Sequence, residues 1–480
     1  MLSRRQALLA GGVAAGILGM PRLLDGAVSA ETAHPAHPVA PRGPGVKPVF
    51  EAFARPMPTP RELVPRLSTR HFDYYTLSVR PSTAEILPGV RTPVLSYGDG
   101  VLGPTIRAKT GRRTFVMVTN KTGSPVNVHL HGGHNAARHD GHPLDLIEPG
   151  RPRLYNYAND QQGATLWYHD HTHHGEAEHV YRGMQGLYLI DDESERGLRL
   201  PSGDYDVPIV LRDSQFDAAG NLLVGDPADR TTPLANGVPL PYFAVAARKY
   251  RFRFVNTANE RIFRLSLGTT AMVQVGSDGG LLAAPAPLDT LVIGSAERAD
   301  VVIDFSAHPV GTQLVLSDEV LGKVLRFDVV REAEDHSRVP EVLRPLPVLP
   351  PATVRRTVNL ALGFADGRLI GLVDNKMFDP DRVDITTKLG TTEIWSVTST
   401  DPPGVFHTFH LHLVQFRVLD RDGRPPAPHE TGWKDTITFA AGETVRVQAT
   451  FHGHTGRFAY HCHFLDHSGI GMMAQLEITR

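Results

Sequence analysis

Histidine placement carries the strongest chemical signal in this 480-residue sequence. Ten of its 24 histidines lie in residues 129–179 and nine in 407–467, whereas residues 201–340 contain only two. Imidazole is the commonest metal ligand among protein side chains, so this clustering predicts metal binding. The two windows hold four short patterns: His129-Leu130-His131, His169-Asp170-His171, His407-Thr408-Phe409-His410-Leu411-His412, and His461-Cys462-His463-Phe464-Leu465-Asp466-His467, which continues to Met472.

Strand geometry divides these candidate ligands between two sites. Side chains on a β-strand alternate between faces, so the two imidazoles of each His-x-His pair point the same way and form a pincer for a metal. In the last pattern Cys462 takes the face opposite to the two histidines beside it, and in the third His407 faces away from the His410–His412 pair. One site therefore collects Cys462 and His407 and the other collects the His-x-His pairs, provided that no bulge interrupts the strands.

The types of ligand favour copper over zinc. A thiolate, two imidazoles and a distant thioether form the trigonal site that selects copper for electron transfer, whereas structural zinc requires four stronger ligands. We predict that Cys462, His407 and His467 form the plane and Met472 the axis, with Met473 as the competing thioether. The eight other imidazoles suit several copper ions: His129, His131, His169, His171, His410, His412, His461 and His463. Nearby histidines off these patterns are interpreted as loop or supporting residues: His134, His139, His142, His173, His174, His179, His452 and His454.

The elements that hold these residues are expected to be short strands. The chain has 45 glycines and 38 prolines, and from about residue 77 short apolar runs alternate with turn residues. No long amphipathic helix is predicted. Residues 111–120, 248–257 and 442–451 each read as a charged turn followed by a strand, which suggests three related β-domains. The predicted fold class is all-β, built from sandwiches or barrels.

Composition shifts along the chain predict its organisation. Eight prolines in residues 33–60 indicate an extended arm, and five in residues 340–351 indicate a connector. We predict an arm at 31–64, a first domain at 65–200, a second at 201–339, a linker at 340–356 and a third domain at 357–480. The 49 basic and 51 acidic residues leave a net charge of −2, which disfavours capture of nucleic acid or an anionic membrane.

The N-terminal segment predicts export. Arg4 and Arg5 precede a 14-residue apolar run at 7–20, which is shorter than the roughly 20 residues that span a bilayer. We predict a signal peptide at 1–30 that follows the twin-arginine route and no membrane anchor; an ordinary secretory signal is the alternative. The protein would then act in the periplasm or outside the cell. Its single cysteine rules out an intrachain disulfide.

The four patterns resemble the copper signatures of the multicopper oxidases, the family of laccase, bilirubin oxidase and ascorbate oxidase. Further segments are similar to the bacterial three-domain branch of spore-coat laccase and bilirubin oxidase: residues 103–106, 129–133, 140–143, 167–171, 276–280 and 432–436. The resemblance implies three cupredoxin-like Greek-key domains and four copper ions. It makes His407, Cys462, His467 and Met472 the type 1 ligands and His129 and His410 the type 2 ligands. The type 3 pair would take His131, His169, His171, His412, His461 and His463.

The resemblance also implies a reaction. A small phenol, aminophenol or pigment gives electrons singly to the type 1 copper, and they pass through Cys462 to His461 and His463. Dioxygen is reduced to water at the other three coppers. Asp140 matches the acid expected near the type 2 copper and is predicted to deliver protons, with a supporting role as its alternative.

Two departures and two alternative functions accompany this interpretation. Thr408 stands where the family usually has proline, and Ser468 stands where the branch usually has an acid. The Ser468 change affects the expected proton route rather than the copper ligands.

A cuprous-ion oxidase is the alternative enzyme, although the nine methionines form no cluster beyond Met472-Met473. A copper-free structural relative is the alternative from another class, but such proteins have lost ligands that this chain keeps.

Overall fold

The computed structural model describes residues 45–98 and 100–480, and nearly all of its regular structure is strand. The predicted signal peptide and the first part of the predicted arm lie outside these residues. Within them the α-helices are short: α2 (Ala137–Asp140), α3 (Glu176–Tyr181) and α4 (Leu465–Ser468). Short 3₁₀ turns complete the helical content: η1 (Glu193–Leu198), η2 (Gly203–Tyr205), η3 (Pro227–Asp229) and η4 (Pro428–Glu430). The described chain contains no helix with the length and apolar character that a membrane crossing requires.

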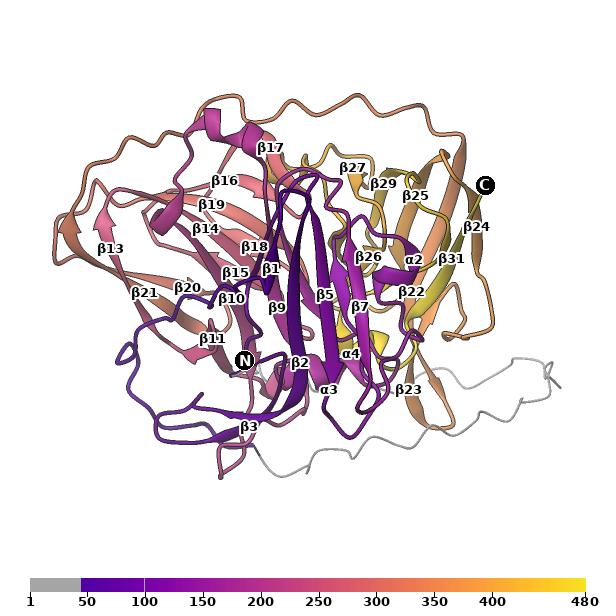
Figure 1. Cartoon of the computed structure of the whole chain (residues 1–480), viewed down its shortest axis with the longest axis horizontal. Coiled ribbons are helices and arrows are strands. Elements are labelled where there is room, and N and C mark those ends of the chain that lie inside the picture. The colour runs from indigo at the N-terminus through magenta and orange to yellow at the C-terminus, as the bar shows by residue number, and fades with distance from the viewer. Residues whose placement is uncertain (1–44, 99) are drawn as a thin grey trace, which may run out of the picture. The chain divides into compact units, whose positions relative to one another are not determined.

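The strands of the described residues form six sheets, which pack in three pairs that we call the first, second and third sandwiches (Figure 1). In the first, the sheet β1-β2-β5-β7, with β3 added to β2, faces the sheet β4-β9-β8-β6. Along β5 buried residues alternate with more exposed ones, as expected for a strand with one face on a core. The strands of the first sandwich are β1 (Leu67–Ser68), β2 (Phe72–Ala84), β3 (Thr92–Ser96), β4 (Ile106–Lys109), β5 (Arg113–Asn120), β6 (His129–His131), β7 (Pro152–Tyr157), β8 (Ala164–His169) and β9 (Gln185–Asp191).

The second sandwich pairs the sheet β12-β11-β10-β14-β19-β16-β17 with the sheet β13-β21-β20-β15-β18. An apolar core that includes Phe252 and Phe327 joins the two sheets. Its strands are β10 (Asp206–Ser214), β11 (Thr232–Ala235), β12 (Val238–Pro239), β13 (Tyr242–Ala247), β14 (Lys249–Asn256), β15 (Phe263–Ser266), β16 (Met272–Ser277), β17 (Gly280–Leu288), β18 (Leu291–Ile293), β19 (Arg298–Asp304), β20 (Gln313–Asp318) and β21 (Gly322–Glu332).

The third sandwich pairs the sheet β23-β22-β25-β29-β27 with the sheet β24-β31-β30-β26-β28. Its core includes Trp395, Phe458 and Cys462, so the single cysteine is held among apolar side chains. Its strands are β22 (Val354–Ala365), β23 (Arg368–Val373), β24 (Ile385–Lys388), β25 (Thr392–Ser399), β26 (Phe406–Leu411), β27 (Phe416–Arg421), β28 (Thr436–Ala440), β29 (Thr444–Thr450), β30 (Gly456–Cys462) and β31 (Met473–Thr479). Residues 333–353, between β21 and β22, contain no regular secondary structure.

The three sandwiches repeat one strand arrangement, and this corrects the third of the predicted repeats. The strands β5, β14 and β25 each pair in parallel with an earlier strand and antiparallel with a later one. The predicted segments 111–120 and 248–257 contain β5 and β14, but 442–451 contains β29, which corresponds to β7 and β19. Both β25 and β29 follow a turn with a left-handed glycine, Gly390 at φ 87° and Gly442 at φ 83°, so the local pattern does not distinguish them.

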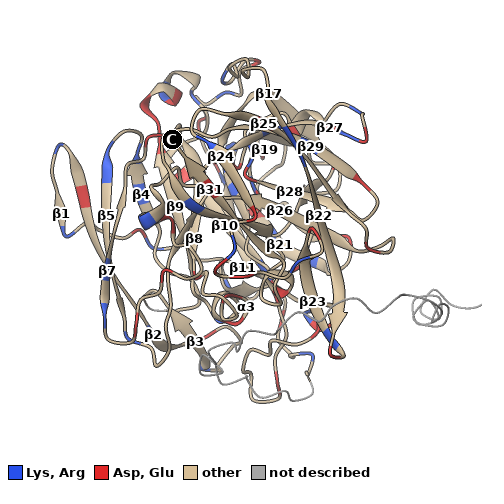
Figure 2. Ribbon diagram, turned by 90° about the vertical axis from the view of Figure 1, so that its right-hand side faces the viewer, with Lys and Arg blue, Asp and Glu red and all other residues tan. Residues whose placement is uncertain are grey.

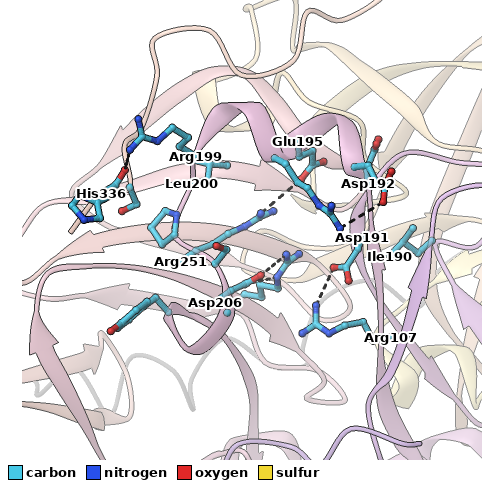
Figure 3. A pocket seen from close by; sticks show the side chains of 18 of the residues that line it. Arg107, Ile190, Asp191, Asp192, Glu195, Arg199, Leu200, Asp206, Arg251 and His336 are labelled. Atoms are coloured by element: carbon cyan, nitrogen blue, oxygen red, sulfur yellow. Dashed lines mark hydrogen bonds and ion pairs between the residues drawn. The ribbon is translucent and has the colours of Figure 1, made fainter. Parts of the chain in front are cut away.

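Basic and acidic positions are interspersed along the ribbon in Figure 2, where they are coloured blue and red. A charged cavity of about 640 Å³ lies beside β9, η1 and β14 (Figure 3). Two of its arginines are paired with acids: Arg253 lies 2.6 Å from Asp206, and Arg107 lies 3.0 Å from Asp191. None of the four histidine patterns lines this cavity. It therefore lies apart from the predicted chemistry.

Candidate metal centres

Strand register brings the four histidine patterns together in two groups. In the first sandwich β6 pairs antiparallel with β8, so that His129 opposes His169. In the third sandwich β26 pairs antiparallel with β30, so that His410 opposes His461. Opposed residues in a sheet point to the same face, so each strand pair presents its histidines together.

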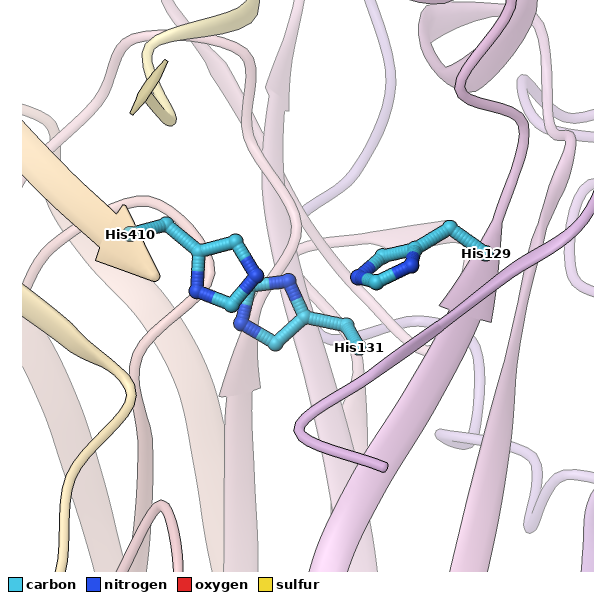
Figure 4. A group of neighbouring side chains, drawn as sticks. All are labelled: His129, His131 and His410. Carbon is cyan, nitrogen blue, oxygen red and sulfur yellow. The ribbon is translucent and has the colours of Figure 1, made fainter. Parts of the chain in front are cut away.

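The two strand pairs face each other across the boundary between the first and third sandwiches. The rings of His129 and His412 stack with centroids 3.9 Å apart, and those of His131 and His410 stack at 3.8 Å. Figure 4 shows His129, His131 and His410 converging from the two sides. All eight imidazoles of this cluster are almost fully buried.

The cluster contains overlapping triads, and of the predicted pincers only His129–His131 stays together in one of them. In each triad the potential ligand atoms lie within 4.8 Å of one another: His129, His131 and His410; His131, His169 and His463; and His171, His412 and His461. The two members of the His169–His171 pair belong to different triads, as do those of the His461–His463 pair. The ring centroids within these two pairs lie 5.8 and 5.3 Å apart, and residues from elsewhere in the two sandwiches complete each triad.

Unpaired nitrogen atoms show that these residues fit a metal cluster. His129 Nδ1 donates to the backbone oxygen of Asp140 at 2.6 Å, and His410 Nδ1 donates to that of Asp435 at 2.8 Å. The other nitrogen of each ring, Nε2, is buried and has no hydrogen-bond partner among the described residues. The same holds for His169 Nε2 and His131 Nδ1. Buried nitrogens without partners are costly, and a bound metal would satisfy them.

Burial also keeps these imidazoles in the form that binds metals. Desolvation, followed by the proximity of neighbouring histidines, lowers the pKa of His171 and of His461 to about 3. The pKa of His169 falls to about 4 for the same reasons. A neutral imidazole offers a free lone pair, so the cluster needs no deprotonation step before it coordinates a cation.

A separate site surrounds the single cysteine. Cys462 Sγ lies 3.6 Å from His407 Nδ1 and 3.7 Å from His467 Nδ1, and all three residues are buried. The far nitrogen of His407, Nε2, lies 2.8 Å from the carboxylate of Asp401, which fixes the ring. Burial raises the pKa of the Cys462 thiol to about 12, so a nearby cation is required to stabilise the thiolate.

The two candidate thioethers occupy different surroundings. Met472 belongs to the same apolar core as Cys462, and the Cys462 N–H donates to the Met472 backbone oxygen at 3.1 Å. Met473 belongs to a small separate cluster with Phe378 and Ala459. Met472, and not Met473, therefore shares the core that surrounds the cysteine site.

Comparison with known proteins identifies the family to which this chain is similar. Models of the multicopper oxidase family match residues 78–195, 214–319 and 350–480. The chain belongs to the multicopper oxidase family. A laccase from Bacillus subtilis is 34% identical, over 90% of this chain and 99% of that protein. Bilirubin oxidase from Albifimbria verrucaria is also 34% identical, over 90% of this chain and 82% of that protein.

A solved structure agrees with the sequence relatives. The laccase of Pediococcus acidilactici has a TM-score of 0.83 and 31% identity, covering 91% of this chain and 95% of that chain. The predicted family and the all-β, cupredoxin-like fold are confirmed. The protein is a laccase-like multicopper oxidase, and membership of the family implies that it binds copper.

Sequence reasoning missed several side chains that support the histidine cluster of this multicopper oxidase. Asp435 places Oδ1 2.9 Å from His131 Nε2 and also lies 2.7 Å from Arg298 Nη1. Glu176 contacts His171 through a short hydrogen bond. Asp435 lies in a segment whose similarity to the family was visible, but Glu176 and Arg298 lie in none of the four patterns. Only their contacts reveal them.

Asp140 holds one histidine of the cluster. It is fully buried in α2, and its Oδ2 accepts a hydrogen bond from His412 Nδ1 at 2.7 Å. A Cβ on the next residue, Gly141 at φ 81°, would come within 2.1 Å of the Val128 backbone oxygen, so this glycine lets α2 approach β6. Burial raises the pKa of Asp140 well above its usual range. The hydrogen bond supports a positioning role, and proton delivery by Asp140 stays a prediction.

We expect Asp140→Ala to weaken copper binding at the histidine cluster by about 10- to 100-fold, the usual effect of removing a partner that orients a ligand. The reason is that the His412 ring loses its acceptor in a site without water access. Asp140→Asn keeps an oxygen that accepts from Nδ1 and should lose less. Copper retained against a chelator measures both variants. Parent-like retention in Asp140→Ala would show that Asp140 does not orient His412.

A cavity opens at the cysteine site. It has a volume of about 360 Å³, and His467 lines it together with the apolar residues Ile262, Leu362 and Phe406. Glu260 also lines the cavity, and its Oε1 lies 3.6 Å from His467 Nε2. Burial, followed by the proximity of Asp466, raises the pKa of Glu260 to about 8. The cavity thus combines an apolar wall with the Glu260 carboxyl group at the edge of His467, and the Asp213–Arg261 ion pair also lines it.

Proposed function

We propose that this multicopper oxidase is an enzyme of the laccase type that oxidises phenols or aminophenols with dioxygen as the electron acceptor. The observation that carries the proposal is the position of Cys462. Its sulfur lies between His407 and His467, and its chain neighbours His461 and His463 belong to two different triads of the cluster. A single residue therefore links the two sites through covalent bonds.

We propose four copper ions at the residues predicted from the sequence. His407, Cys462, His467 and Met472 would hold one ion, His129 and His410 a second, and the other six histidines a pair. The ions would supply one-electron transfer and the reduction of dioxygen to water. The protein would keep the imidazoles neutral, orient them through Asp140 and Asp435, and exclude water from the cluster.

The proposed docking site for the reducing substrate is the cavity beside His467. Its apolar residues suit a planar aromatic ring, and the carboxyl group of Glu260 can form a hydrogen bond with a ring hydroxyl or amino group. His467 forms part of its lining, so a bound ring would lie against a side chain of the cysteine site.

Export by the twin-arginine route stays a prediction from Arg4 and Arg5.

A turnover panel under air tests the proposed substrate class. We expect the copper-loaded protein to be blue and to oxidise phenols and o-aminophenols, with dioxygen uptake and no accumulated hydrogen peroxide. Bilirubin and Cu(I) salts complete the panel. Rapid oxidation of Cu(I) with negligible turnover of every aromatic substrate would replace the proposal by a cuprous-ion oxidase. A colourless preparation that has taken up copper would contradict the proposed cysteine site.

A further inference from the structure

A buried carboxylate joins the histidine cluster to the segment that holds the cysteine site. Ser468 stands where the family resemblance led us to expect an acid, and its hydroxyl donates a short hydrogen bond to Glu176 Oε1. The other carboxylate oxygen of Glu176, Oε2, makes a short hydrogen bond with His171 Nδ1. Glu176 is 1% exposed, and the other two residues are fully buried. The acid missing at 468 is thus matched by an acid in the first sandwich that contacts the same serine.

The two short helices that carry this contact lie close to candidate ligands in the chain. Glu176 opens α3, five residues after His171, whereas Ser468 closes α4 and is the next residue after His467. Asn259 reinforces the same junction, because its side chain donates to the Ala177 backbone oxygen at 2.9 Å. Its own backbone oxygen accepts from Leu465 N–H at 2.8 Å. One carboxylate therefore connects a triad histidine with the segment that holds the cysteine site.

The charge environment of Glu176 already includes one other buried carboxylate, that of Asp170, which is paired with His179. Among the described residues, the only ion pair of Glu176 is with His171, and no lysine or arginine contacts it. A second acid at 468 would place two buried carboxylates in contact, which disfavours ionisation of both. The serine hydroxyl, in contrast, donates a proton to the carboxylate and completes its hydrogen bonding.

We infer that Glu176 is a positioning residue for the histidine cluster: its carboxylate orients His171 and, through Ser468, fixes α4 against the first sandwich. The inference rests on the proposed function only for the identity of the metal. The hydrogen bonds of Glu176 with His171 and Ser468 are independent of it. It also gives a structural reason for the serine at position 468. The carboxylate at this junction comes from Glu176 of the first sandwich instead, and it contacts both Ser468 and His171.

Four variants and a matched control test this role. Glu176→Ala should weaken copper retention at the histidine cluster by about 10- to 100-fold, as loss of an orienting partner usually does, while the blue colour of the cysteine site persists. Ser468→Ala should have a smaller effect, and Ser468→Glu should be at least as damaging as Glu176→Ala. The exchange Glu176→Ser with Ser468→Glu restores one carboxylate and one hydroxyl and should recover at least part of the retention. Glu178→Ala, in the same helix but paired with Arg182, is the control.

The unfolding temperature of the copper-free protein gives a second measurement that does not depend on the metal. We expect the effects of Glu176→Ala and Ser468→Ala to be non-additive, because both remove the same hydrogen bond. Additive effects, or an exchange variant that retains no more copper than Ser468→Glu, would overturn the inference. A parent protein that binds copper but oxidises no aromatic substrate would refute only the proposed function, since retention and non-additivity would still report on Glu176.

Discussion

Replacing Cys462 by serine is expected to remove the blue colour and to reduce substrate oxidation to the level of a protein-free control. Serine preserves the size of the side chain but lacks the thiolate that selects copper in a trigonal site. Cys462 is the chain's single cysteine, so no second thiol can replace its sulfur between His407 and His467. Absorption spectra and dioxygen uptake measure the two effects. Unchanged turnover would contradict the proposed role of Cys462 as the link that carries electrons from the cysteine site to the histidine cluster.

Two controls separate this effect from misfolding. Cys462 lies in the core of the third sandwich. Because serine has nearly the same size and shape as cysteine, the far-ultraviolet circular dichroism and the unfolding temperature of the serine variant should stay close to those of the parent. The histidine cluster keeps all eight imidazoles, so the variant should still bind copper there. If the variant loses all copper together with its fold, Met472→Leu offers a milder change at the same site, with altered blue absorption as its expected result.

Replacing Arg298 by alanine is expected to lower the free energy of unfolding by about 3–5 kcal/mol, the range for breaking a buried ion pair. Arg298 is 1% exposed and belongs to the second sandwich. Its Nη2 lies 2.5 Å from Asp435 Oδ2 in the third sandwich, and its Nε donates to the Thr165 backbone oxygen in the first at 2.9 Å. The variant would leave Asp435 buried without that partner, beside His131.

Denaturant unfolding of the copper-free protein measures the Arg298 effect. The matched control is Arg264→Ala: this arginine is 42% exposed in its side chain and lies 3.8 Å from Glu319. Exposed pairs of this kind contribute about 0–1 kcal/mol. An Arg298→Ala loss as small as that of the control would contradict the importance of the buried network. Copper retention should fall as well, because Asp435 orients His131.

The sequence by itself determined which residue types are available to bind a metal. Through the alternation of side chains between the two faces of a strand, it also determined how these residues divide between two sites. Strand periodicity is local, so the spacing of the His461-Cys462-His463 pattern was sufficient to place Cys462 opposite its two neighbours. The ligand roles stay predictions, but the residues proposed for them meet in two groups. The family resemblance came from the same short patterns, because a metal site needs particular side chains at particular intervals along a strand.

Tertiary structure alone decided which histidines meet in each triad and what holds them. Each triad joins strands of the first and third sandwiches, and Asp140, Glu176 and Arg298 contact partners 137 to 292 residues away in the chain. No local pattern encodes such pairings, because they depend on how separately folded sheets pack. The third predicted repeat was wrong for the related reason that β25 and β29 share one local turn and differ only in their strand partners.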